Sequence, residues 1–160
     1  MEKIVTVKLK QIDQSNWEEC ANLRVSVDQK DALPSNLISI VELNFYPQTK
    51  AVAILNEEGV IVGFATFGIP KGESVSKIFR LMIDEGHQGK GYGRAALIEI
   101  SKELFAKNSS DEIQVCYHPH KKSLKDFYGA IGFKEKELLM SKRREEGKML
   151  ATLSRDGFRF

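Results

Sequence analysis

Residues 83–97, IDEGHQGKGYGRAAL, carry the pattern that decides the fold. A strand-like apolar run over 78–83 leads into this stretch, and a run with helical spacing follows it. Three alternating glycines, Gly89, Gly91 and Gly93, leave the main chain bare at the junction. Glycine is typical where a backbone needs positive φ or where a ligand approaches it closely. Because the first amides of a helix attract anions, the junction predicts a phosphate site.

Three kinds of phosphate site fit a glycine-rich loop. A P-loop requires a lysine and a hydroxyl residue after its last glycine, and here Gly93 is followed by Arg94 and Ala95. The segment GYGRAA, residues 91–96, fits the relaxed dinucleotide fingerprint, but only one βαβ unit is available and its second strand ends in CYHPH instead of an acidic residue. The segment QGKGYG, residues 88–93, fits a third pattern, Q-x-x-G-x-G.

Hydrophobic periodicity predicts the order of elements along the chain. Alternation with a period of two indicates strands, and apolar residues at steps of three and four indicate helices. The expected order is βααββ, then βαβ, then αββ. By residue number we expect a strand at 3–12, helices within 13–27 and 33–46, a hairpin at 51–69, a strand at 76–84, a helix at 93–108, a strand at 112–118, a helix within 121–133, and a hairpin at 136–153 turned around Glu145 to Gly147.

Composition restricts the class of protein. The chain has 160 residues, of which 42% are hydrophobic, so we expect one domain over residues 1–160. A net charge of +2 with dispersed basic residues predicts no nucleic-acid partner. Cys20 and Cys116 form no ligand or disulfide pattern, which predicts no metal and a reduced, cytoplasmic protein. No apolar run is long enough to cross a bilayer, so we expect no membrane partner.

Two motifs together resemble one family. The Q-x-x-G-x-G loop, followed by Arg94 and a helix, resembles the acyl-CoA pyrophosphate loop of the GCN5-related N-acetyltransferase (GNAT) superfamily. Its second signature, a tyrosine followed by three residues and Gly-Phe, stands here as FYGAIGF with Tyr128, Gly132 and Phe133. NWEECANLRV, SNLISIVELNFYP, VGFATFGI and RLMIDEGHQGKGYGRAAL are similar to bacterial diamine or spermine/spermidine N-acetyltransferases.

The resemblance implies a fold and a cofactor. The expected fold is α/β (α+β), with a mixed, mostly antiparallel sheet of about seven strands, splayed at the cofactor strand, and about four helices. The cofactor would be acetyl-CoA, with the strand at Leu81, Met82 and Ile83 pairing with pantetheine and the amide of Met82 or Ile83 near the acetyl oxygen. The diphosphate would lie on Gln88, Gly89, Lys90, Gly91, Tyr92, Gly93 and Arg94.

The implied reaction is direct attack of an amine on the thioester, with no acyl-enzyme. Tyr128 matches the family tyrosine that protonates the departing sulfur, whereas Cys116 is expected to be a buried strand residue. The base is open between His118, Asp84 and Glu85, with His118 the first choice. For an amine substrate we expect contacts from Glu42, Tyr46 and Asp84, and further candidates are Glu18, Glu19, Asp28, Asp31 and Phe45.

The acceptor amine and the oligomeric state are expected only by analogy with the family. A small-molecule amine, a polyamine or diamine, is the expected acceptor, and a homodimer is possible. Relatives often carry an asparagine and an acidic residue where this chain has Lys121 and His120, which changes the charge near the acetyl site. The alternatives are acetylation of a protein or antibiotic amine, and a non-catalytic acyl-CoA-binding regulatory module.

Overall fold

The computed structural model describes residues 4–25, 35–107, 109–141 and 144–160. These form β1 (Lys8–Gln11), α1 (Trp17–Ala21), α2 (Asn36–Glu42), β2 (Thr49–Leu55), β3 (Ile61–Gly68), β4 (Ser76–Ile83), the 3-10 helix η2 (Glu85–His87), α3 (Tyr92–Lys107), β5 (Glu112–Tyr117), α4 (Lys122–Gly129), β6 (Lys134–Ser141) and β7 (Arg144–Ser154). The order of strands and α-helices is the one that the sequence predicts.

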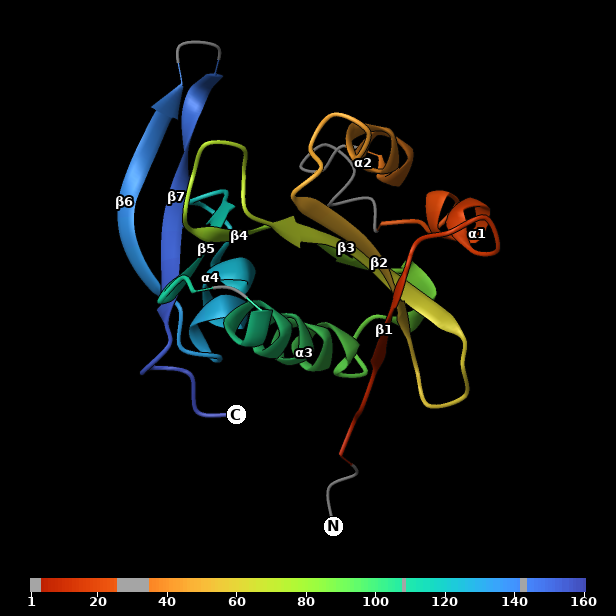
Figure 1. Ribbon diagram of the computed structural model, residues 1–160. Coiled ribbons are helices and arrows are strands. Elements are labelled where there is room, and N and C mark those ends of the chain that lie inside the picture. The colour runs from red at the N-terminus through yellow and green to blue at the C-terminus, as the bar shows by residue number, and fades with distance from the viewer. Residues whose placement is uncertain (1–3, 26–34, 108, 142–143) are drawn as a thin grey trace.

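All these strands belong to one seven-stranded sheet, in the order β1-β2-β3-β4-β5-β7-β6. Neighbouring strands are antiparallel except for β4 and β5, which are parallel. α3 crosses one face of the sheet, and α1 and α2 lie on the other side (Figure 1). The mixed, mostly antiparallel α/β fold expected from the resemblance is therefore confirmed.

Apolar clusters fill both faces of the sheet. The larger cluster includes Leu97 and Ile100 of α3 together with Val115 of β5. The smaller cluster includes Cys20 of α1 and Phe64 of β3. Removing this apolar surface from water is the main force that holds the helices on the sheet.

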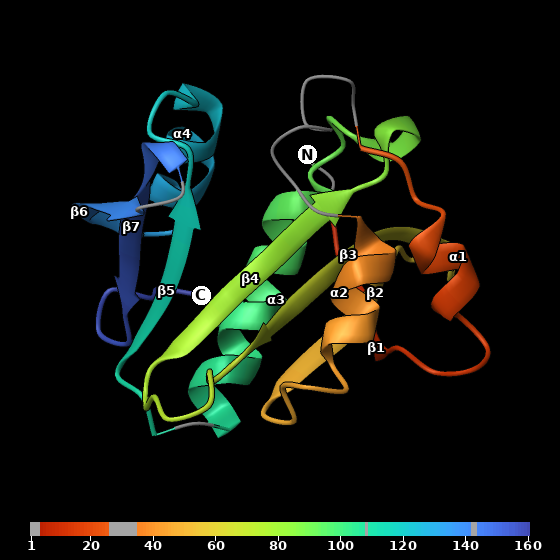
Figure 2. The same ribbon diagram turned by 90° about the horizontal axis from the view of Figure 1, so that it is seen from above.

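β4 and β5 pair only where the two strands begin. Ser76 is opposite Ile113 and Lys77 is opposite Gln114, and the register of these two fully described strands contains no further pair. Toward their carboxyl ends the strands diverge, as Figure 2 shows. The sheet is thus split, and one side of the last residues of β4 has no strand partner.

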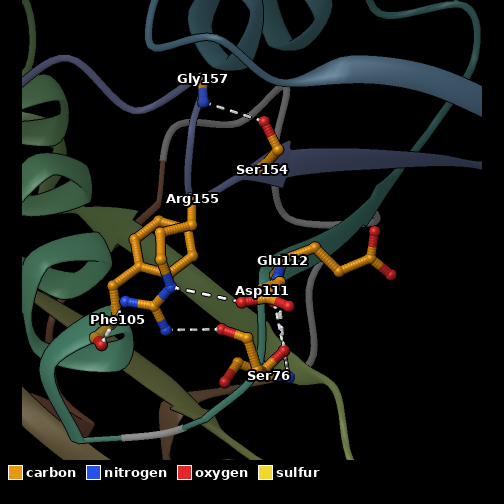
Figure 3. Close-up of polar contacts among 8 residues, drawn as sticks. Ser76, Phe105, Asp111, Glu112, Ser154, Arg155 and Gly157 are labelled. Carbon is orange, nitrogen blue, oxygen red and sulfur yellow. Dashed lines mark hydrogen bonds and ion pairs between the residues drawn. The ribbon is translucent and has the colours of Figure 1, made fainter.

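Arg155 links chain segments at the paired end of this split, where β4 and β5 begin (Figure 3). Its Nη1 donates to the carbonyl oxygen of Phe105 at 2.8 Å, and its Nη2 donates to the carbonyl oxygen of Ser110 at 2.8 Å. The Ser110 hydroxyl oxygen accepts a bond of 3.4 Å from the amide of Ser76, the first residue of β4. One guanidinium therefore joins the end of α3 to the segment before β5, beside the last β4–β5 pairs.

Two predicted boundaries are wrong. Residues Glu145 to Gly147 lie inside β7, which begins at Arg144 opposite Ser141, and do not form the hairpin turn. A Cβ at Gly147 would come 2.9 Å from the carbonyl oxygen of Leu139, so this glycine allows close approach of two strands where their register is irregular.

The first strand is also shorter than predicted. It covers Lys8–Gln11 instead of 3–12, because its partner β2 ends at Leu55, opposite Lys8. The helix expected within 13–27 is reduced to Trp17–Ala21, and residues 26 and 27 lie outside the described part of the chain.

Candidate active site

The glycine loop follows β4 directly and is tied back to it. Gln88 Nε2 donates to the carbonyl oxygen of Ile83 at 2.9 Å. Gly89 and Gly91 then adopt φ angles of 76° and 87°, a region that favours glycine. A Cβ at Gly89 would meet no atom within 4 Å, so the loop backbone is open to a ligand on this side.

The start of α3 completes an anion site. The first helical hydrogen bond runs from the amide of Ala95 to the carbonyl oxygen of Gly91, at 3.1 Å. The amides of Tyr92, Gly93 and Arg94 therefore precede the intrahelical ladder, and the positive end of the helix dipole lies behind them. This geometry fits a diphosphate.

The two basic residues of the loop lie differently. Lys90 is exposed and, with Glu57, Glu58 and Tyr92 among other residues, lines a hollow of about 220 Å³. The Arg94 guanidinium lies over the ring of Phe160, 5.4 Å from its centroid. This cation–π contact holds the charge of Arg94 beside the first turn of α3.

The backbone of β4 presents alternate residues to the split. The amide of Asp84 donates to Val62 of β3 at 2.8 Å, so the alternation of an antiparallel pair also directs the amide of Met82 toward β3. The amides of Leu81 and Ile83 then face the split. Of the two amides expected near an acetyl oxygen, that of Ile83 is the one on the open side.

Tyr128 of α4 lies in an aromatic group on the other side of the split. Its half-buried ring stacks on Tyr117 of β5, with 5.6 Å between centroids and 9° between planes. The rings of Phe127 and Phe133 meet it edge-on at 5.0 Å and 5.4 Å. Burial raises the pKa of Tyr128 to about 12, so its hydroxyl remains a proton donor at neutral pH.

The local chain explains why glycine and phenylalanine follow this tyrosine. Gly132 has a φ of 119°, which lets the amide of Phe133 turn back and donate to the carbonyl oxygen of Tyr128 at 3.2 Å. A Cβ at Gly132 would lie 3.1 Å from a methyl carbon of Leu153 on β7. The motif thus ends α4 and places the Phe133 ring against Tyr128.

A single contact links Tyr128 to the glycine loop. A Cβ at Gly93 would lie 3.4 Å from the ring of Phe127, so α4 packs directly on the first turn of α3. Because Phe127 also contacts the ring of Tyr128, with 5.0 Å between centroids, one side chain connects the Tyr128 ring to the first turn of α3. The structure therefore brings together the two motifs that are 35 residues apart in the chain, from Gly93 to Tyr128.

The remaining expected site residues are less closely grouped. His118 is half-buried just after β5, where its ring is 6.2 Å from that of His120. Glu42 and Tyr46 are exposed on and after α2. The carboxylate of Asp84 accepts from the amides of Arg24 and Gly86, at 2.9 Å and 3.3 Å, and so fixes the start of the loop.

Other sequence candidates have simpler positions. Glu18 and Glu19 are exposed on α1, Phe45 is exposed after α2, and Glu85 is exposed in η2. The expected contacts of Asp28 and Asp31 fall outside the described residues.

Cys116 is exposed on β5, and the expectation of a buried strand cysteine is wrong. The apolar cluster under α3 contains Val115 and Tyr117, so the alternation of the strand turns Cys116 to the opposite face. Desolvation of the thiol raises its pKa, while the charges of Lys148 and Lys77 act in the other direction. A thiol with a raised pKa is a poor nucleophile.

One polar residue was missed by reading the sequence. Arg80 of β4 is only 5% exposed, although FRLMI reads as an ordinary apolar strand. The available signal was an arginine inside a run of apolar residues, where a charge is unusual without a partner.

The whole arrangement matches one family. A model described as "Acetyltransferase (GNAT) family" matches residues 10–133. The chain belongs to this family. GNAT enzymes use acetyl-CoA as cofactor, and the bare glycines and open helix amides of this chain fit its diphosphate.

Solved structures share the GNAT fold at low sequence identity. The spermidine N-acetyltransferase from Vibrio cholerae in complex with CoA and spermine is 13% identical, with a TM-score of 0.76 over 95% of this chain and 97% of that chain. The ribosomal-protein-S5-alanine acetyltransferase from Vibrio fischeri is 18% identical, with a TM-score of 0.74 over 99% of this chain and 98% of that chain. No curated protein matches the sequence.

The described ranges, 4–25, 35–107, 109–141 and 144–160, lack two further classes of feature. No helix there has the length and apolar character needed to cross a membrane. No group of three or more His, Cys, Asp or Glu side chains in those ranges is arranged to hold a metal ion.

Proposed function

We propose that this protein transfers the acetyl group of acetyl-CoA to a primary amine of a small molecule, by direct attack with no acyl-enzyme. The observation that carries the proposal is the position of Tyr128 beside the glycine loop, at the open end of the β4–β5 split. A site of this kind needs a clamp for the cofactor, donors for the developing oxyanion and an acid for the leaving group.

The clamp is assigned to the loop and to β4. The backbone from Gln88 to Arg94 would hold the diphosphate, and the free edge of Leu81, Met82 and Ile83 would pair with the amide groups of pantetheine as an added strand does. Acetyl-CoA, when bound, supplies the activated acetyl thioester. The amide of Ile83 faces the split and would be the donor for the acetyl oxygen.

The two proton transfers of the reaction are assigned to Tyr128 as acid and His118 as base. Tyr128 would donate its phenolic proton to the departing sulfur, and burial keeps this phenol protonated at neutral pH. His118, half-buried at the end of β5, would take a proton from the substrate ammonium group, and the neutral amine that results would attack the thioester carbonyl. Asp84 and Glu85, at the end of β4, are the alternative bases, although the backbone contacts of Asp84 favour a structural part for it.

Two acceptor classes have support. A polyamine or diamine is favoured by similarity to the Vibrio cholerae enzyme crystallised with spermine, and Glu42, Tyr46 and Asp84 would contact it. An amine that also carries a carboxylate is favoured by one observation on this chain, the buried Arg80. Acetylation of a protein or antibiotic amine stays an alternative, and the similar Vibrio fischeri structure is that of a ribosomal-protein-S5-alanine acetyltransferase. A cytoplasmic location and a homodimer stay predictions.

The test is release of free CoA from acetyl-CoA in the presence of spermidine, spermine, putrescine, lysine, an aminoglycoside and a peptide with a free N-terminus. Tyr128→Phe should lower kcat by about 100-fold or more, while calorimetry shows unchanged affinity for CoA. Tyr117→Phe is the matched control: it removes a stacked phenol whose hydroxyl donates to Glu135 at 2.8 Å, and turnover should persist. CoA binding without turnover of any amine would favour the regulatory module instead.

A further inference from the structure

A buried cation lies on the acceptor side of the sheet. Arg80 of β4 is 5% exposed, and its Nε donates to the side-chain oxygen of Asn36 at 2.6 Å. Its Nη1 is buried and has no hydrogen-bond partner among the residues that the structure describes. Throughout the described ranges, no carboxylate lies within ion-pair distance of this guanidinium.

The described side chains around Arg80 include one neutral acceptor, the amide oxygen of Asn36, but no carboxylate. Arg80 is opposite Thr66 in the β3–β4 register, so both side chains lie on the same face of the sheet. That face packs under α1 and α2, where the buried residues Asn36 and Ser39 also lie. The rest of this face is apolar, with Cys20, Ala51, Ala53, Phe64 and Met82 in one cluster.

An unpaired cation in such a place is costly. Burial lowers the pKa of Arg80 to about 10, which reports the desolvation penalty, yet the group stays charged at neutral pH. Removing a charge from water without a counter-ion destabilises a fold. A buried polar group that is left unpaired is therefore a candidate for a functional role. An anion that arrives with a substrate would supply the missing partner.

Arg80 is also close to the expected reaction centre. It precedes Met82 by two residues on the same strand, a separation of roughly 7 Å at the usual strand rise. Across the split, Cys116 lies on the same face of the sheet, where the charges of Lys148 and Lys77 act to lower its pKa against the larger effect of desolvation. Lys77 is paired with Glu73 at 2.9 Å, so the carboxylate of Glu73 is already engaged by another cation.

We infer that Arg80 binds a carboxylate carried by the acceptor amine, so that the substrate is an amino acid or a similar amine bearing an acid group. This inference rests on the proposed acetyl transfer and names the acceptor class for the same site. The guanidinium can offer two parallel N–H donors to a carboxylate, and the Thr66 hydroxyl is a further donor on the same face. A polyamine offers no group that satisfies Nη1.

Matched substrate pairs isolate the carboxylate. Lysine differs from cadaverine, and ornithine from putrescine, only by the α-carboxyl group. We would measure kcat/KM for all four amines with acetyl-CoA in the wild type, in Arg80→Met and in Arg80→Lys. Within each protein we would take the ratio of kcat/KM for the amino acid to kcat/KM for its diamine. A partial folding defect lowers both values equally and so cancels from the ratio.

The wild type should favour lysine and ornithine over their diamines by about 10-fold to 100-fold, the range of a charged hydrogen bond. Arg80→Met should bring both ratios close to one, and Arg80→Lys should restore part of the preference. Equal use of both members of a pair, preference for the diamines, or a preference that survives in Arg80→Met would each refute the inference. A preference for succinyl-CoA over acetyl-CoA that depends on Arg80, with no acceptor preference, would overturn it in favour of the acyl donor.

A binding measurement separates this inference from the proposed function. If CoA binds but no amine is turned over, the proposed acetyl transfer fails. Thermal shift in the presence of CoA then decides the part played by Arg80. Lysine and ornithine should raise the Tm of the wild type, but not that of Arg80→Met, and cadaverine should raise neither. Equal shifts in the two proteins would contradict carboxylate binding at Arg80.

Discussion

Gly132→Ala should destabilise the protein strongly although it adds one methyl group. The φ of 119° at Gly132 is nearly confined to glycine, and holding another residue there costs about 1–3 kcal/mol. The new Cβ would also meet Leu153 at 3.1 Å and the carbonyl oxygen of Gly157 at 3.2 Å. Crowding of that kind adds about 1 kcal/mol or more. We expect a total loss of about 3 kcal/mol in the free energy of unfolding.

Gly129→Ala, at the last residue of the preceding helix α4, is the matched control. Gly129 lies at the end of α4 without a positive φ, and a Cβ there meets nothing within 4 Å. Alanine should therefore be neutral or stabilise by up to about 1 kcal/mol. Urea unfolding followed by circular dichroism measures both variants. If Gly132→Ala unfolds at the same urea concentration as the wild type, the account of the tyrosine motif as a backbone device is wrong.

Three further outcomes are expected. Gly91→Val should weaken CoA binding by about 10-fold or more in calorimetry, because valine is strained at a φ of 87° and its Cβ would lie 3.4 Å from a methyl carbon of Val5, so the loop backbone would have to shift. Gly59→Val, at a similar φ of 79° in the β2–β3 turn, should cost stability but leave CoA affinity unchanged. The pKa of Tyr128 is raised from 10.0 to about 12, so its contribution of roughly 2–3 kcal/mol is present below pH 10 and lost as pH rises toward 12. Urea unfolding between those pH values should therefore show a smaller loss in Tyr128→Phe than in the wild type. Cys116→Ser should keep turnover near the wild-type value, since direct transfer requires no thiol, and a loss above about 100-fold would indicate an acyl-enzyme.

Much of the fold could be predicted because local patterns agree with the tertiary structure. The run of apolar residues at steps of three and four in α3 marks the face that packs on the sheet, and the loop glycines mark positive φ. The local structure around Tyr128 could also be predicted from its motif, because Gly132 allows the amide of Phe133 to hydrogen-bond the carbonyl oxygen of Tyr128.

The errors arose where pairing across the sheet decides the outcome. The glycine at 147 resembles a turn residue, and only the neighbouring strand shows that it permits close approach. Cys116 lies in an apolar strand, but α3 covers only one face of β5, and Cys116 is on the other face. Arg80 could not be interpreted from sequence, because the lack of a counter-ion depends on which side chains lie on α2 and β3.

The split beside β4 also determines how its amides exchange with deuterium. The amide of Met82 is directed toward β3 and should exchange slowly at all times, whereas those of Leu81 and Ile83 face the gap and should exchange fast. Cofactor bound along this edge would slow the fast pair and leave the slow amide unchanged. Cofactor binding would thus change the exchange rate at every second amide of β4. This pattern would locate the bound molecule without any assay of turnover.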